Sequence, residues 1–243
     1  MSGAPPPVLL EAAGAYYRAA GRFAWHFART KLRADPAYAL ILERGLLKDC
    51  RQLLDLGAGQ GLLGAWLLGA ASCHARERAG AWPRGWPAPP RLTSYTGIEI
   101  NLKEVRRARR AFAGDSGTLI QMVHGDIREA DFGSPDAIVL MDVLHYNDFS
   151  AQERILSRAR AALSPGGLLL LRIGDAAGGY GFTLSKAVDR SVALMRRGRW
   201  LPLHCRTLAD WQGLLRSAGF ATQRVGISRG RSFDNTLLLG EAA

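Results

Sequence analysis

Apolar residues in this chain follow two patterns, and from about residue 50 onward the two patterns alternate. A short continuous apolar run predicts a buried strand, whereas apolar positions three and four residues apart predict a helix. Strands are expected at 53–56, 94–100, 118–125, 136–142, 168–173, 221–228 and 235–241, and helices at 62–71, 102–112, 150–163 and 207–220. This alternation predicts a doubly wound α/β sheet whose last two strands form an antiparallel pair.

The first 47 residues lack strand patterns and predict an N-terminal helical extension, or lid, ahead of a main domain at 48–243. From Leu10 onward apolar and aromatic residues recur at helical spacing, which predicts one long helix up to Asp35-Pro36 and a second helix after it. The Pro-rich leader at 1–10 is expected to be disordered.

Two stretches interrupt the alternation within the main domain. Residues 74–92 form a Trp/Pro-rich segment without periodicity, a length of loop that is typical of a lid or a surface feature. A helical insertion is expected at about 174–204, with a glycine-rich start and an amphipathic helix at 181–200.

The most informative stretch is Leu53–Gly64, LLDLGAGQGLLG, which reads as a strand, a tight turn and the start of a helix. Glycines at alternate positions let the backbone adopt positive φ and let a ligand approach closely. The helix start adds unpaired N–H groups. Asp55 lies two residues before the first glycine, Gly57, and its carboxylate favours a cationic ligand over a pyrophosphate. The plain alternative is a turn that only packs the helix on the sheet.

This motif resembles the first motif of class I S-adenosylmethionine (SAM)-dependent methyltransferases, and LSPGGLLLLRI resembles a marker of their small-molecule members. The combined resemblance covers about residues 50–240 and extends to methyltransferases of pigment and aryl-polyene pathways. It implies a seven-stranded, mostly parallel Rossmann-like sheet in the order 3-2-1-4-5-7-6. It also implies SAM as cofactor and S-adenosylhomocysteine (SAH) as product.

The resemblance places the cofactor-binding residues at the ends of successive strands. Glu99 ends the second strand and is expected to bind the ribose hydroxyls, although a role in capping the next helix is the alternative. Asp126 is expected to accept from the adenine amine, and Ile127 to cover the ring. The full expected set is Asp55, Gly57, Ala58, Gly59, Glu99, Ile100, Asp126, Ile127 and Asp142.

Two polar residues follow the strand at 136–142, where an acceptor would approach the methyl group. His145 is the first choice for a general base because imidazole titrates in the useful range, and Asp148 is the second catalytic candidate. The alternative is that His145 only bonds to backbone or orients the substrate, and Tyr146 is interpreted as a wall residue. Cys73-His74 and His204-Cys205 lack a C-x-x-C partner, so no metal site is expected.

Composition changes this picture only slightly. The net charge of +11 suggests a polyanionic partner, but only four of the 32 basic residues are lysines, and the arginines are spread along the chain. We therefore favour a generally basic surface over a dedicated nucleic-acid patch. No run of about eighteen apolar residues predicts a membrane span, and the N-terminus lacks a secretory pattern. With three scattered cysteines, the expected compartment is the cytoplasm.

The expected reaction is O-methylation, or ring C-methylation, of a small phenolic or polyketide-like acceptor. Three aromatic segments suggest an apolar lid over such an acceptor: the N-terminal helix, the loop with Trp82 and Trp86, and the helix at 181–200. The basic charge and the resemblance suggest a further partner, an acidic acyl carrier protein that presents the acceptor.

Other functions remain open at this level. An RNA methyltransferase is suggested by the basic charge, although D-V-L-H-Y stands where amino-methylating nucleic-acid enzymes carry an N-P-P-Y type tetrapeptide. A SAM-binding partner protein without activity is the second alternative. A dehydrogenase is the least favoured, because the spacing differs from G-x-G-x-x-G.

Overall fold

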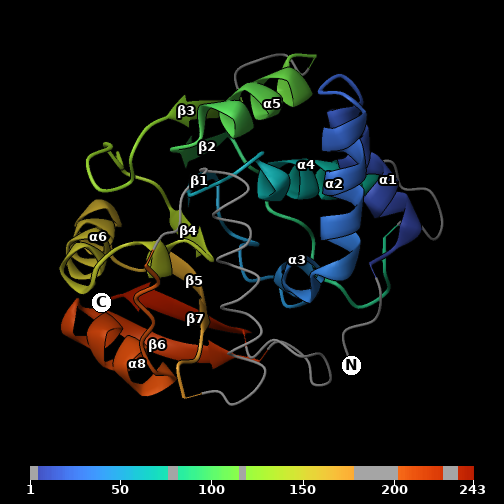
Figure 1. Ribbon diagram of the computed structural model, residues 1–243. Helices are drawn as coiled ribbons and strands as arrows, with labels where there is room; N and C mark the ends of the chain where they lie inside the picture. The colour runs from blue at the N-terminus through green and yellow to red at the C-terminus, as the bar shows by residue number, and fades with distance from the viewer. Residues whose placement is uncertain (1–4, 76–81, 115–118, 178–201, 227–234) are drawn as a thin grey trace. The chain divides into compact units, whose positions relative to one another are not determined.

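The computed structural model describes residues 5–75, 82–114, 119–177, 202–226 and 235–243. Seven strands form one sheet in the order β3-β2-β1-β4-β5-β7-β6 (Figure 1). Strands β1, β2 and β3 pair in parallel, as do β4 and β5, whereas β7 pairs antiparallel with both β5 and β6. The predicted doubly wound fold, its strand order and the antiparallel end pair are confirmed.

The chain divides into two compact units, 1–124 and 125–243. The first unit combines the N-terminal helices with the first three strands. Its elements are α1 (Pro7–Ala15), η1 (Tyr16–Arg18), α2 (Arg22–Ala34), α3 (Pro36–Glu43), β1 (Gln52–Leu56), α4 (Leu62–Ala75), β2 (Ser94–Glu99), α5 (Leu102–Phe112) and β3 (Ile120–His124).

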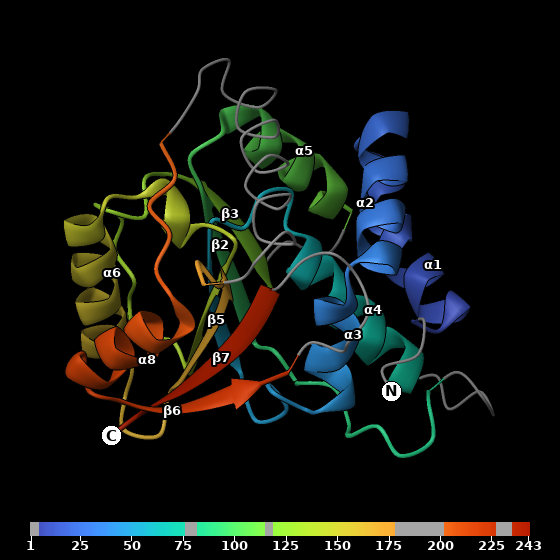
Figure 2. The ribbon, with the colours of Figure 1, turned by 60° about the horizontal axis from the view of Figure 1, so that its bottom comes forward.

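The N-terminal helices pack directly on the helix that follows the glycine turn (Figures 1 and 2). Helix α1 approaches α4 so closely that a Cβ on Gly69 would lie 2.9 Å from the backbone nitrogen of Ala13. The fully buried Trp66 of α4 donates from Nε1 to the carbonyl of Tyr38 in α3 at 2.8 Å. These contacts join the predicted extension to the core of the first unit. The predicted boundary at 47/48 stays a prediction.

Two expectations for the N-terminal region are wrong. The long helix expected before Asp35-Pro36 is interrupted at Gly21, whose φ of 100° breaks the helical backbone between η1 and α2. The leader expected to be disordered contains the start of α1, because a proline is compatible with the first helical position and Pro7 takes it. Residues 1–4 lie outside the described part of the chain.

The second unit holds the remaining four strands and the helices that accompany them. Its elements are β4 (Ala137–Met141), η2 (Leu144–Tyr146), α6 (Phe149–Ala162), β5 (Leu168–Gly174), α8 (Leu208–Ser217), β6 (Phe220–Val225) and β7 (Asn235–Ala242). Both β4 and β5 are buried along nearly their whole length, as the continuous apolar runs predict. A capping box between Thr207 and Asp210 begins α8, which packs beside β6.

Most of the predicted insertion at 174–204 and its helix at 181–200 lie outside the described residues. The same holds for 76–81 within the Trp/Pro-rich segment. The first two residues of the segment end α4, and from residue 82 to β2 the chain has no helix or strand. Trp82 and Trp86 meet edge to face with ring centroids 5.8 Å apart.

Candidate functional site

The glycine turn between β1 and α4 is held tightly on one side and open on the other. Gly57, Gly59 and Gly61 all have positive φ, between 58° and 79°. The amides of Gly57 and Ala58 both donate to the carbonyl of Ile98 in β2, at 2.8 and 3.1 Å. A Cβ on Gly61 would lie 2.8 Å from the Phe112 ring, whereas one on Gly59 would meet no atom of the described residues within 4 Å. Within the described part of the chain, Gly59 is therefore the position where the turn faces open space.

Glu99 connects the end of β2 to this turn. One carboxylate oxygen accepts from the Gly59 amide at 3.0 Å, and the other accepts from the Asn101 amide at 2.7 Å. Helix α5 is capped by the Asn101 side chain, which accepts from the amide of Lys103. The alternative interpretation of Glu99 as the cap of the next helix is wrong. Glu99 is 9% exposed, and its carboxylate fixes the backbone of the glycine turn instead.

Asp55 lies beneath the turn and is buried with a tyrosine. Its Oδ2 accepts from the Tyr95 hydroxyl at 2.5 Å. Burial raises the pKa of Asp55 to about 7; the Tyr95 hydrogen bond opposes this rise, and the charge of Glu99 adds to it. The same carboxylate contributes to a pKa of Tyr95 well above its ordinary value, after the larger effect of burial. At neutral pH Asp55 is therefore about half ionised.

The predicted adenine-binding residues lie in the second unit. Asp126 accepts a hydrogen bond from the backbone amide of Arg128 at 2.9 Å. It also forms an ion pair with the Arg128 guanidinium, whose Nη2 lies 2.5 Å from Oδ2 of Asp126. That ion pair raises the pKa of Arg128. Ile127 is buried at 7% exposure. Adenine binding by this pair stays a prediction.

Asp142 directly follows β4 and forms an ion pair within the second unit. Among the described residues other than glycine, it alone has positive φ, at 57°. Its carboxylate accepts from Nε of Arg172 in β5 at 2.8 Å, and Nη2 of the same side chain also contacts it. The Arg172 side chain is 4% exposed and that of Asp142 is 29% exposed. Because Arg172 is buried, Asp142 supplies the charge that balances it.

His145 lies in η2, three residues beyond Asp142. The residue is half-buried, but its Nε2 atom is shielded from solvent. Burial lowers the pKa of His145 to about 4; Asp142 raises it and Arg172 lowers it further. The imidazole is therefore neutral at physiological pH, and it lies against the Tyr146 ring with centroids 4.3 Å apart. A neutral imidazole can accept a proton, but a pKa near 4 makes it a weak base.

Asp148, the second catalytic candidate, lies at the N-terminus of α6. Its Oδ1 accepts from the amide of Ala151 at 2.7 Å and from the hydroxyl of Ser150 at 2.8 Å. The backbone hydrogen bond lowers the pKa of Asp148 most, followed by the Ser150 bond. This is the geometry of a helix N-cap. A catalytic role of Asp148 stays a prediction, and the contacts assign it a structural one.

Comparisons with known proteins address the class of the domain. A family described as "Methyltransferase domain" matches residues 54–169. The matched stretch comprises 116 of the 243 residues. The match runs from within β1, through the glycine turn, to the start of β5 and includes Glu99 and His145. It confirms the predicted enzyme class at this level.

Individual relatives agree with the methyltransferase domain. Acetylserotonin O-methyltransferase of Mus musculus is 30% identical over 194 residues, which cover 76% of this chain and 43% of the relative. The chain thus spans less than half the length of that relative. An O-methyltransferase family protein from Burkholderia thailandensis superposes with a TM-score of 0.61 at 22% identity, over 93% of this chain and 62% of the other.

A second solved structure has the fold at nearly matched length. Magnesium protoporphyrin IX methyltransferase from Synechocystis PCC 6803, solved with bound SAH, gives a TM-score of 0.59 at 17% identity. The superposition covers 94% of this chain and 93% of the other.

Two residues of the candidate site were missed by the sequence analysis. Tyr95 and Arg172 lie inside apolar strands, and a polar residue in a buried run is the signal that would have identified them. Within the described residues, no group of three or more His, Cys, Asp or Glu side chains could hold a metal ion. No helix of that described part is long and apolar enough to span a membrane.

Proposed function

We propose that this chain transfers a methyl group from SAM to the hydroxyl oxygen of a small aromatic acceptor. The observation that carries the proposal is the glycine turn held by Glu99, which leaves Gly59 facing open space. Support for oxygen as the accepting atom comes from relatives that are named O-methyltransferases. Ring carbon is the second candidate atom.

The residues around the turn fit the chemistry of SAM. A Cβ at position 59 would point into the open space on which the turn borders, so glycine suits both the backbone and a close ligand. Each oxygen of Glu99 accepts one backbone hydrogen bond and keeps a further lone pair for a hydroxyl donor. Two vicinal ribose hydroxyls match that remaining capacity. Gly57, Ala58, Asp55 and Ile100 complete the proposed lining on the first unit.

When bound, SAM supplies a methyl group already activated by the sulfonium. The protein then has to hold the acceptor hydroxyl in line and exclude water. His145 is proposed to accept the hydrogen bond of that hydroxyl and to receive its proton. The hydroxyl becomes much more acidic as its oxygen gains the methyl carbon, so a base with a pKa near 4 is sufficient at that stage. Tyr146, packed on the imidazole, is proposed as an aromatic wall.

Asp126, Ile127 and Asp142 are proposed to contribute to cofactor binding from the second unit, as the resemblance implies. The ion pair of Arg128 with Asp126 predicts a specific consequence. Replacing Arg128 with methionine is expected to change the affinity for SAH, because it releases the Asp126 carboxylate. An unchanged affinity would remove Asp126 from the proposed site.

The cofactor part is tested by calorimetry of SAH binding to the full chain. Gly59→Ala is expected to abolish measurable binding because it adds a Cβ in the open space beside the glycine turn, where the cofactor is proposed to lie. Gly85→Ala is the matched control, because Gly85 also has positive φ (83°) and a Cβ added there would meet none of the described atoms within 4 Å. Gly85 lies in the loop before β2, away from the glycine turn. An equal loss of SAH affinity in both variants would show that backbone strain, and not a Cβ beside the cofactor, causes the effect.

The acceptor part is tested with SAM carrying a trideuterated methyl group and a panel of phenols. Mass spectrometry should find the label on oxygen with the native chain and strongly reduced label with His145→Gln. Binding of SAH without labelling of any phenol would favour the non-catalytic alternative. Labelling of RNA in a parallel arm would favour an RNA substrate.

A carrier-bound acceptor is a further proposal, and it is based on the net charge of +11. Binding of an acidic acyl carrier protein should weaken steeply when salt is raised, because Debye screening shortens to below about 5 Å at 0.5 M. Binding that is unchanged at 0.5 M salt would contradict an electrostatic interaction.

A further inference from the structure

Gln152 of α6 is a fully buried amide that holds together backbone segments distant in the sequence. Its Nε2 donates to the carbonyl oxygens of Leu144 at 3.3 Å and Asn147 at 3.0 Å, on either side of His145 and Tyr146. The same nitrogen donates to the carbonyl of His204 at 2.8 Å. One side chain therefore fixes both ends of the loop that carries His145.

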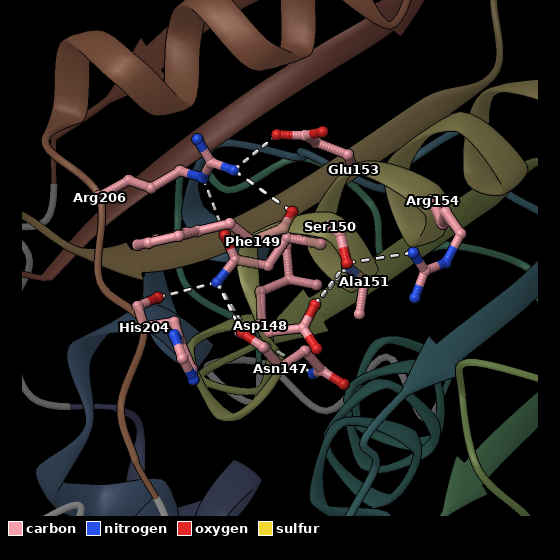
Figure 3. A network of polar contacts seen from close by, with 11 residues as sticks. Asn147, Asp148, Phe149, Ser150, Ala151, Glu153, Arg154, His204 and Arg206 are labelled. Carbon is pink, nitrogen blue, oxygen red and sulfur yellow. Dashed lines mark hydrogen bonds and ion pairs between the residues drawn. The ribbon is translucent and has the colours of Figure 1, made fainter.

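Arg206 determines which way this amide faces. Its Nε donates to Oε1 of Gln152 at 2.9 Å, so the NH₂ group must face the carbonyls. The other end of the guanidinium donates to the Phe149 carbonyl and to Glu153, and its plane lies over the Phe149 ring at 4.6 Å (Figure 3). An arginine held by this many contacts has little freedom to turn. We call Gln152 together with Arg206 the clasp.

The clasp joins the His145 loop to the segment 202–206, which includes the end of the predicted insertion. Residues 178–201 lie outside the described part, and the segment 202–206 comes directly after them. That segment also bonds His145 itself, because the His204 amide donates to the His145 carbonyl at 2.8 Å. Any displacement of the 204–206 backbone therefore pulls on the His145 loop through two independent hydrogen bonds.

We propose that Gln152 is a positioning residue for methyl transfer, which, with Arg206, locks the His145 loop to the segment on which the insertion ends. The proposal rests on the proposed function for the role of His145, but the clasp itself does not. Helix stability alone does not require a buried amide here, since its hydrogen bonds all leave α6. The side chain instead serves the backbone around His145.

The test replaces Gln152 with methionine, which keeps the length of the side chain and removes its polar atoms. Amide hydrogen exchange should become about tenfold faster at His204 and in the loop 144–147, as expected for loss of about one net hydrogen bond, while β5 stays protected. By NMR, the pKa of the His145 imidazole should rise from about 4 toward 6.5, since a loosened loop admits water. Asp142 and Arg172, the charged groups that act on His145, are unchanged in this variant.

Glu153→Gln is the matched control. It removes the exposed ion pair of Arg206 and leaves the clasp intact, so exchange and His145 titration should match the native chain. Arg206→Met should shift the same readouts in the same direction but by less, because it removes only the bond that orients the Gln152 amide, and the double variant should add little to Gln152→Met.

Two results would overturn the proposal. One is uniformly faster exchange in Gln152→Met with an unchanged His145 titration, which is the signature of a residue that only stabilises the fold. The other is an equal His145 shift in the Glu153→Gln control. SAH affinity is measured alongside and should change less than about twofold. Failure of the native chain to bind SAH would contradict the proposed function. The exchange and titration results would still show whether the clasp holds the His145 loop in place.

Discussion

In the first unit the Asp55 carboxylate is paired with a neutral donor, the Tyr95 hydroxyl, whereas in the second unit His145 lies near two opposite charges. Asp55 bonds to the Tyr95 hydroxyl, and burial raises its pKa to about 7. His145 lies near the Asp142–Arg172 ion pair, and burial lowers its pKa to about 4. In both places the shift favours the neutral form, which is the general effect of desolvation.

The two units differ in whether their buried ionisable group can become neutral. Arg172 cannot lose its proton, so the second unit has to supply Asp142 as a counter-charge at a strained backbone position. Asp55 can take up a proton, so the first unit needs no cation beside it. We infer that the second unit is the more sensitive of the two to loss of a charge.

The largest expected effect is on the ion pair. Asp142→Asn leaves the Arg172 charge buried without its partner and should lower the free energy of unfolding by about 3–5 kcal/mol. Urea denaturation of Asp142→Asn and of Tyr95→Phe, each compared with the native chain, measures the two losses of unfolding free energy. A smaller loss of unfolding free energy for Asp142→Asn than for Tyr95→Phe would contradict the greater sensitivity of the second unit to loss of a charge.

The second effect is on the pH dependence of stability, where the two groups act in opposite directions. His145 has a lowered pKa, so the unfolded chain binds more protons between about pH 4 and 6.5 and this group makes stability rise with pH there. Asp55 has a raised pKa, so the folded chain binds more protons between about pH 4 and 7 and stability falls with pH. Across its window the contribution is about 3 kcal/mol for His145 and about 4 kcal/mol for Asp55.

Single variants separate the two slopes. Relative to the native chain, His145→Gln should make stability fall more steeply with pH between about 4 and 6.5, and Asp55→Asn should make it rise. Denaturation at a series of pH values is the measurement. The same direction of change in both variants would contradict the opposite shifts.

Loss of the tyrosine hydroxyl should have a smaller effect. Tyr95→Phe removes one hydrogen bond from a carboxyl that can be protonated, and should cost about 1 kcal/mol of stability. Because that bond lowers the pKa of Asp55, the variant should raise this pKa further, as carbon-13 NMR of the carboxyl would record. A fall in the Asp55 pKa would show that the bond acts in the opposite sense.

The smallest effect is expected at Asp148. Asparagine is an N-cap as good as aspartate, so Asp148→Asn should leave the melting temperature and the methyl transfer rate unchanged. Methyl transfer that disappears at an unchanged melting temperature would instead restore Asp148 as a catalytic residue.

The sequence predicted features whose causes are local. Alternating glycines after a short apolar run indicated the turn at Gly57–Gly61, and continuous apolar runs located β4 and β5. The strand order came from the resemblance, because pairing between distant strands leaves little trace in one sequence. The break at Gly21 was missed because aromatic spacing continues across it.

The partners within the candidate site could not be predicted in the same way. Tyr95 and Asp55 are separated by 40 residues, and Gln152 and Arg206 by 54, and neither spacing has a periodic signature. Glu99 was located at its strand end, but its bond to the Gly59 amide depends on the register of β1 and β2. Asp148 was assigned chemistry from its place after β4, although its contacts are those of a helix cap.

Calorimetry of SAH with the native chain and with Glu99→Ala tests the central claim most directly. The native chain should bind, and the variant should bind about 10- to 100-fold more weakly, because it loses charge-assisted hydrogen bonds and frees the Gly59 amide. Glu241→Ala, on the exposed end of β7, should bind like the native chain. Equal affinity in Glu99→Ala would contradict the placement of the cofactor, and absence of binding to the native chain would contradict the proposed function itself.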